Sequence, residues 1–396
     1  MKNTFRKSLS MILALMMIVA VMLSATACGG GGGNGDPDDK GSAGRSDFID
    51  SLGGVSDTFK GAVSEESYES ALEAAAAFVE DEIAGESEAT VVNAVSKGEV
   101  SASSINIPDE LTEGIVSVEE YEVEYSLSDG PALMSAGAGN SSKKITVYII
   151  KYESEWKYFT PAPITGETIS KSYYDSVFNA EKYKNCTYKS DMTMDMEMVA
   201  AAQGLTQTIN MTMSMSQFVK YAEGKLYLEM TTSMTSNMPD MIGQGGNSTI
   251  KVYVEEVDGE LTCYADIGDG EGWRETNLGT VGFGSLDDLT PFNDQYIDYS
   301  YFTKTDYGFK IADENAAKFI DELYSELLIM YDESFGIDMF AEYYVSDGVL
   351  SGMRMDMDMD INMSESGSTV TGGANIEVTT TCTDYGTTVV DKPVMN

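Results

Sequence analysis

The sequence predicts an α+β protein: an antiparallel curved sheet of half-barrel form with helices on its concave side, preceded by a smaller α+β domain in which one helix lies on a sheet. Long runs alternate methionine with polar residues, which is the period of a half-buried strand. Hairpin turns are predicted at four dipeptides, most of which lie between alternating runs: Glu223-Gly224, Asp258-Gly259, Tyr307-Gly308 and Asp347-Gly348. Few segments have helical spacing, and 396 residues leave room for two or three domains of roughly 150 residues.

The first 27 residues predict an export signal. A positively charged start precedes residues 9–23, which are apolar but too short to cross a bilayer of about 30 Å as a helix. Residues 25–28, Ala-Thr-Ala-Cys, resemble the lipobox of bacterial lipoproteins. The resemblance implies that Cys28 begins the mature chain and carries a diacylglyceryl group. We then expect an extracytoplasmic protein anchored to the cell membrane; an ordinary signal peptide with a cysteine beside the cut is the alternative.

A flexible tether is expected over residues 28–46, because the Gly-rich stretch after Cys28 has no apolar residue to bury. The smaller domain is then assigned to residues 47–165, and the half-barrel to residues 166–396.

One helix and three strands are predicted in the smaller domain. Residues 68–79 have apolar positions at helical spacing, with Ser64 as a start signal and Gly85 as a stop. Strands are expected at residues 118–125, 145–152 and 156–159, the last two joined by a tight turn.

This order, ending in the hairpin Lys-Tyr-Glu-Ser-Glu-Trp-Lys at residues 151–157, resembles the cone-shaped nuclear-transport-factor-like domains that recur in bacterial lipoproteins. Some members of that superfamily are enzymes with a carboxylate or histidine in the cone. No residue of this sequence is assigned that role.

Three methionine runs define the second domain. Successive strand residues point to opposite faces of a sheet, so each run places its methionines on one face and its polar partners, many of them acidic, on the other. The runs are Met192, Met194, Met196 and Met198; Met211, Met213 and Met215; and Met353, Met355, Met357, Met359 and Met363. We expect about ten antiparallel strands.

Helices are expected at three places in this domain. They cover residues 169–184, a short segment from Leu286 capped by Ser285, and residues 313–331. The last has an apolar stripe that includes Phe319, Leu323 and Leu327, so we expect it to pack on the methionine side of the sheet.

Residues 168–392 resemble the LolA/LppX-like carriers of lipids and lipoproteins. The resemblance rests on the order of a helix, the strand Tyr-Lys-Ser-Asp-Met-Thr-Met-Asp-Met, the hairpin Ala-Glu-Gly-Lys-Leu-Tyr-Leu, a helical insertion, and a final hairpin leading to Met-Asp-Met-Asp-Met. In that family an apolar groove between sheet and helices holds acyl chains. The arginine that fixes the closed state in the LolA branch has no counterpart assigned here.

A ligand groove lined by methionine is therefore the leading hypothesis for function. Its candidate residues are Met192, Met194, Met196, Met198, Met211, Met213, Met215, Met353, Met355, Met357, Met359, Phe319, Leu323 and Leu327. Unbranched methionine repacks around different ligands, whereas a core that only has to be stable favours Leu, Ile and Val. The main alternative is a surface protein-interaction or structural lipoprotein with a fully packed half-barrel.

Composition excludes several function classes. The chain has no histidine, which removes Ser-His-Asp, Cys-His and His-based zinc chemistry. A net charge of −41 argues against nucleic acid as a partner. We expect a monomer that is not an enzyme and has no cofactor.

Metal binding and disulfides are further questions. Thioethers suit Cu(I), but alternate residues of one strand lie about 7 Å apart, so copper would need donors from a second strand. Asp356, Asp358 and Asp360, and the turn at residues 266–271, lack the geometry of a calcium loop. Cys186, Cys263 and Cys382 allow at most one disulfide, which the sequence leaves open.

Overall fold

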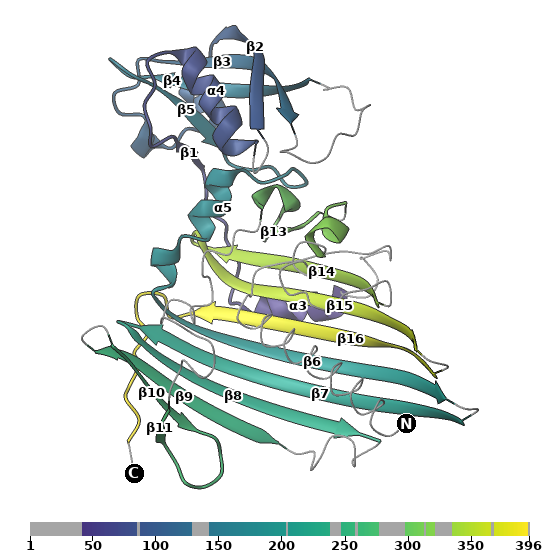
Figure 1. Ribbon diagram of the computed structural model, residues 1–396. Helices are drawn as coiled ribbons and strands as arrows, with labels where there is room; N and C mark the ends of the chain where they lie inside the picture. The colour runs from purple at the N-terminus through teal and green to yellow at the C-terminus, as the bar shows by residue number, and fades with distance from the viewer. Residues whose placement is uncertain are drawn as a thin grey trace.

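The computed structural model contains two antiparallel sheets in one chain (Figure 1). It describes residues 42–84, 88–128, 142–202, 205–237, 247–257, 260–276, 298–312, 314–320, 335–365 and 368–394. A five-stranded sheet has the order β1-β5-β4-β3-β2, and an eleven-stranded sheet has the order β11-β10-β9-β8-β7-β6-β16-β15-β14-β13-β12. This open sheet agrees with the predicted α+β half-barrel class, with one strand more than the ten expected.

The smaller sheet carries one helix on its face. Its elements are β1 (Gly61–Val63), α4 (Ala71–Glu82), β2 (Glu88–Glu99), β3 (Ser117–Ser128), β4 (Lys143–Lys151) and β5 (Trp156–Pro161), with single 3₁₀ turns at Ala102–Ile105 and Asp109–Leu111. Phe78 of α4 packs with Val123 of β3 and with Val147 and Ile149 of β4, and these side chains form the core of this unit.

The predicted helix and three strands of this unit are confirmed, with one correction at the helix start. Ser70, not Ser64, caps α4, because its side chain accepts a hydrogen bond from the backbone N–H of Glu73. Gly85 lies outside the described residues. Strands β1 and β2 were not predicted, since β1 has three residues and β2 is interrupted by two register shifts against β3 that break its alternation.

The larger sheet consists mainly of hairpins, which are joined by one pair of strands that lie far apart in the sequence. Its strands are β6 (Asn185–Ala202), β7 (Leu205–Ala222), β8 (Lys225–Ser236), β9 (Ser248–Val257), β10 (Glu260–Asp266), β11 (Arg274–Thr276), β12 (Phe302–Thr305), β13 (Gly308–Ile311), β14 (Phe335–Ser346), β15 (Val349–Glu365) and β16 (Ser368–Thr383). The pair β6–β16 joins the two ends of this segment in the middle of the sheet, over sixteen aligned positions from Ser368↔Ala202 to Thr383↔Thr187.

Two of the four expected hairpin turns have the predicted chemistry. Glu223 and Gly224 between β7 and β8 have φ of 54° and 71°, and Asp347 and Gly348 between β14 and β15 have φ of 53° and 71°. Positive φ at both central residues is the two-residue turn whose twist matches paired strands. The turn expected at Tyr307-Gly308 falls one residue earlier, at residues 306–307, because Thr305 pairs with Gly308. The proposed turn at residues 258–259 lies outside the described residues.

Helices of the second unit are shorter than predicted where they are described. The segment expected at 169–184 splits into α5 (Lys171–Val177) and a 3₁₀ turn at Ala180–Tyr183. Ser170 caps α5 by accepting from the N–H of Tyr173. Of the long helix expected at 313–331, residues 316–320 are described and are helical. The short helix expected from Leu286 lies outside the described residues.

A helix that was not predicted crosses the expected boundary between tether and small domain. Helix α3 (Ser42–Ser51) packs on the larger sheet, not the smaller one: Phe48 contacts Tyr344 edge-to-face at 5.4 Å, and a Cβ added at Gly352 would lie 2.9 Å from Leu52. It lies on the outer face, opposite the methionines, because Tyr344 and Gly352 alternate with Tyr343 and Met353. The expectation of a tether up to residue 46 is corrected here, and α3 is a helix on the outer face in addition to those predicted.

A buried ion pair holds α3 in place. Arg45 donates from Nε and Nη2 to the two carboxylate oxygens of Glu342, both at 2.7 Å, and the Tyr344 hydroxyl donates to the same carboxylate at 2.8 Å. The Glu342 side chain is 1% exposed and that of Arg45 is 40% exposed. A bidentate pair raises the pKa of Arg45 and keeps it charged. The charge of the buried Glu342 carboxylate is therefore compensated by Arg45.

The chain then runs along the larger unit before it enters the smaller sheet. Asp57 accepts from the Tyr173 hydroxyl at 2.7 Å and pairs with Lys304 at 3.2 Å, and both of these ion-pair side chains are nearly buried. Phe59 packs on Tyr173 with ring centroids 5.1 Å apart. These contacts fix the route between α3 and β1.

Glu82 at the end of α4 links the two units. Its carboxylate accepts from the backbone N–H of Ser172 at 2.9 Å and from the Ser172 hydroxyl, both in α5. Burial raises the pKa of Glu82, and this effect outweighs the lowering by the Ser172 hydrogen bonds and by Lys171.

We predict that Arg45→Ala lowers the free energy of unfolding by about 2 kcal/mol, because Glu342 stays buried without its cation; the partial exposure of Arg45 keeps the loss below that of a fully buried pair. Urea unfolding measures this. Arg274→Ala, which breaks two exposed pairs, is the control and should cost less than about 1 kcal/mol. Equal losses for the two variants would contradict the anchoring role of Arg45.

We predict that Glu82→Gln gains stability relative to wild type as pH rises from 4 to 7. A carboxyl whose pKa is raised on folding stabilises the native state fully only below its unfolded pKa, and that contribution is lost as pH rises through the folded value. The amide of Gln keeps an acceptor for Ser172 without a charge to bury. Urea unfolding at both pH values tests this, with the exposed Glu80→Gln as control. A difference that does not change with pH would contradict it.

Candidate binding face

The methionine runs meet in rows that cross the larger sheet. The register aligns Met339, Met357, Ile376, Met194, Met213 and Met234 on β14, β15, β16, β6, β7 and β8. On either side, Met355, Val378, Met192 and Met215 form one row, and Met359, Ala374, Met196 and Met211 form another. We call this surface the methionine face.

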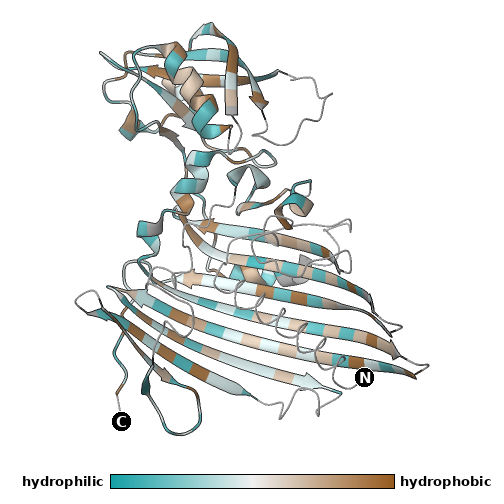
Figure 2. Cartoon of the chain, in the orientation of Figure 1, coloured by the Kyte–Doolittle hydropathy of each residue, from teal (hydrophilic) through white to brown (hydrophobic). Residues whose placement is uncertain are grey.

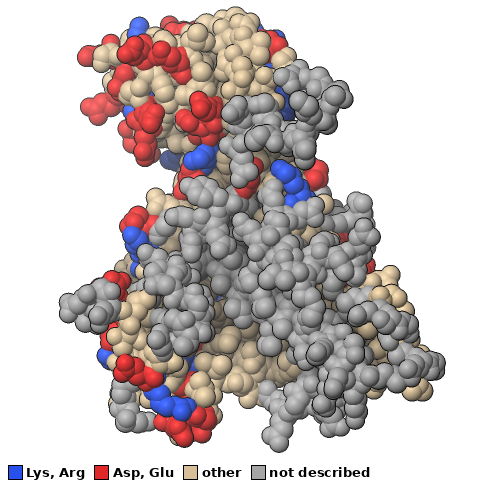
Figure 3. Space-filling view, viewed as in Figure 1, with Lys and Arg blue, Asp and Glu red and all other residues tan. Residues whose placement is uncertain are grey.

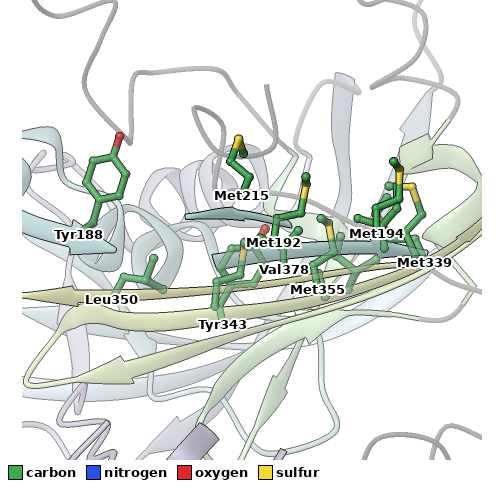
Figure 4. Packing of buried hydrophobic residues seen from close by; sticks show 14 of the residues in the cluster. Tyr188, Met192, Met194, Met215, Met339, Tyr343, Leu350, Met355 and Val378 are labelled. Carbon is green, nitrogen blue, oxygen red and sulfur yellow. The ribbon is translucent and has the colours of Figure 1, made fainter. Parts of the chain in front are cut away.

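The predicted alternation between faces is confirmed at these strands. The eleven candidate methionines between Met192 and Met359 are buried, none more than 5% exposed. On the opposite face Thr193, Asp195 and Ser214 are exposed. Figure 2 shows the resulting alternation of hydropathy along the long strands, and Figure 4 shows Met192, Met194, Met215 and Met339 rising from the same side of the sheet.

Aromatic side chains close one end of the face. Phe309 stacks on Tyr343 with centroids 5.0 Å apart, and Phe302 meets Tyr343 edge-on at 5.6 Å. Phe319, a candidate residue, is buried in the same core and contacts Tyr301 at 6.1 Å. Leu323, Leu327 and Cys28 lie outside the described residues.

Three methionines of this face were missed from the sequence. Met339 lies in β14, and Met230 and Met234 lie in β8, where they pack against the same core. The signal available for Met339 was the alternation of apolar and polar residues in Ile337-Asp338-Met339. It is obscured because β14 has aromatic residues at both odd-numbered and even-numbered positions.

A short polar row interrupts the methionine face. Register aligns Thr380 of β16, Ser190 of β6 and Gln217 of β7, between Met353 and Met230. All three are buried, with exposures of 1%, 2% and 8%. The Thr380 hydroxyl donates to the Ser190 hydroxyl at 3.1 Å, whereas the Gln217 Oε1 atom has no hydrogen-bond partner. The sequence pattern did not identify this row.

The acidic outer face is not uniformly solvated. Arg354 is buried and pairs with Asp356 at 3.1 Å, and burial raises the pKa of Asp356. Asp358 accepts from Asn375, and Asp269 pairs with Arg274. Within the described ranges, no group of three or more His, Cys, Asp or Glu side chains could hold a metal ion.

Cysteine thiols in this unit are free and buried. Cys186, Cys263 and Cys382 form no disulfide, which answers the question that the sequence left open. Burial raises the pKa of both Cys186 and Cys382 to about 12, so the thiolate needed for disulfide exchange is scarce.

Comparison with known proteins yields no family for this chain. No protein-family model matches it, and no curated protein matches it significantly. A DUF1329 family protein from Desulfovibrio piger aligns over 52% of this chain and 90% of its own, with 8% identity and a TM-score of 0.19. OccK11 (OpdR) from Pseudomonas aeruginosa aligns over 67% and 90%, with 8% identity and a TM-score of 0.09. Neither likeness is close enough to bear on function.

Among the residues that the structure describes, no helix has both the length and the apolar character needed to cross a membrane.

We predict that Met213→Ala costs about 3 kcal/mol of unfolding free energy, because it removes a buried side chain at the centre of a methionine row. The matched control is Ser214→Ala, the next residue of the same strand, which is exposed on the other face and should change stability by less than about 0.5 kcal/mol. Urea unfolding compares the two. Similar effects at both positions would contradict the assignment of faces.

Proposed function

We propose that the protein is an exported lipoprotein, anchored through a diacylglyceryl group on Cys28, whose methionine face binds the apolar part of a lipid. The observation that carries this proposal is the set of methionine rows: at least three aligned rows lie side by side on neighbouring strands of one face. A face of this size built from thioether chains is deformable in a way that a Leu, Ile and Val core is not.

Dimensions support an acyl chain as the ligand. Met192 to Met198 spans six strand steps, about 20 Å, which is close to the length of a long acyl chain. The positions of β16 that pair with Met196 and Met198 carry small residues, Ala374 and Gly372. Since these methionines are buried, a ligand must enter by displacing side chains that now pack together.

The charge of the chain supports a position away from the membrane surface. Figure 3 shows acidic side chains gathered over the smaller unit, where exposed acids include residues 65, 66, 73, 80 and 81. A strongly acidic protein is repelled by an anionic membrane, so a lipid anchor would hold it close without adsorption.

Copper(I) is the second candidate, favoured by the cross-strand register. A single strand spaces its methionines too widely to share one ion, but Met194, Met213 and Met234 are direct neighbours on β6, β7 and β8. Three thioethers from adjacent strands form a soft donor set.

Binding of an uncharged fluorescent probe, pyrenyldecyl methyl ether, tests lipid binding. We expect saturable binding by the purified chain, and we expect lipid in solvent extracts of protein purified from its native membrane. The triple variant Met194→Leu, Met213→Leu and Met357→Leu should remain folded, because each swap nearly conserves volume, and should bind the probe roughly two- to tenfold more weakly.

The matched control carries three outer-face changes, Thr193→Ser, Glu197→Gln and Ser214→Ala, and should bind as wild type does. A folded wild-type chain that binds no probe and yields no lipid would overturn the proposal in favour of a packed structural or interaction module. Saturable Cu(I) uptake against a competing chelator, without probe binding, would favour copper.

A further inference from the structure

The buried amide of Gln217 is the feature of the methionine face that packing alone does not explain. Burial alternates with period two along β7, and Gln217 continues the buried series of Met211, Met213 and Met215. Its side chain therefore points to the methionine face. The residue is 8% exposed, and its Oε1 atom has no hydrogen-bond partner.

An acceptor in this position is costly to the protein by itself. A buried amide oxygen without a donor loses its hydration and gains nothing in return. Its two cross-strand neighbours do not supply the donor: the Ser190 hydroxyl accepts from Thr380 and forms no hydrogen bond to Oε1, and Met230 is a thioether with no N–H or O–H.

The polar row also lies beside the methionine rows. Ser190 lies two residues from Met192, and Gln217 lies two residues from Met215, about 7 Å along each strand. Met192 and Met215 belong to the methionine row that lies next to the polar row. A ligand lying along the methionines from Met198 to Met192 would bring one end to Gln217.

Charge on this face restricts the ligand further. Across β6, β7, β8, β14, β15 and β16, no Lys or Arg of the described residues alternates onto the methionine face: Lys189, Lys220, Lys225 and Arg354 all lie on the opposite parity. Lys304 of β12 continues this row beyond Tyr343, but it lies six strands from Gln217 and already pairs with Asp57. An anionic headgroup beside Gln217 would therefore have no cation next to it.

We propose that Gln217 is the polar anchor of the binding face, and that the ligand is a neutral amphipath whose polar end carries a hydroxyl or amide N–H that donates to Gln217 Oε1. This inference rests on the proposed function, since it names the class of lipid that the methionine face takes. The hydroxyl of Ser190, which already accepts from Thr380, is placed to contact the same polar end.

The test compares three pyrene probes that share one apolar chain: pyrenedecanol, its methyl ether and pyrenedecanoate. Wild type should bind the alcohol about fivefold more tightly than the ether, the gain from one buried hydrogen bond. It should bind the anionic decanoate more weakly than the alcohol.

Gln217→Leu should lose the preference for the alcohol over the ether. It should also be at least as stable as wild type in urea, because it removes an unpaired buried polar group. Gln217→Met is the second variant, with nearly the same length. Gln207→Leu, the same change at an exposed position of β7, is the matched control and should keep the preference.

Outcomes separate this inference from the proposed function. Equal wild-type affinity for alcohol and ether would overturn the role of Gln217, as expected if water satisfies the amide, while ether binding would still support the methionine face. Tighter binding of the decanoate than of the alcohol would overturn the neutral ligand class. Absence of binding for every probe would instead overturn the proposed function itself.

Discussion

Burial of one face of the long strands is the constraint on which the rest of the larger unit depends. From Met192 to Met198, from Met211 to Met215 and from Met353 to Met359, strand geometry puts every second side chain on the same side. A slip of one residue in any pair would expose a whole methionine run, so this burial fixes the register of the sheet. The pair β6–β16 then places the runs next to each other rather than at separate edges.

Polar chemistry is concentrated at the few places where this pattern is broken. On the outer face, Glu342 is buried because α3 covers it, and Arg45 compensates its charge. On the methionine face, Thr380 donates to Ser190, but the Oε1 acceptor of Gln217 has no hydrogen-bond partner. The first site explains how the N-terminal segment docks on the sheet, and the second is the observation from which we propose the class of ligand.

The contacts of residues 42–59 connect the two units to the chain's N-terminal end. Helix α3 is held on the larger sheet, Asp57 pairs with Lys304, and only then does the chain enter β1 of the smaller sheet. Glu82 and Ser172 join the smaller unit to α5 beyond it.

The sequence alone determined the features that local patterns encode: the fold class, the faces of the methionine runs, α4, and the turns at Glu223-Gly224 and Asp347-Gly348. Tertiary structure decided what depends on partners far apart in the chain. Polar α3, the short β1 and the interrupted β2 have weak local signals and exist through their contacts with other elements. The alignment of Thr380, Ser190 and Gln217, and the pairing of Arg45 with Glu342 nearly 300 residues away, follow from long-range strand pairing and helix docking, which no local period contains.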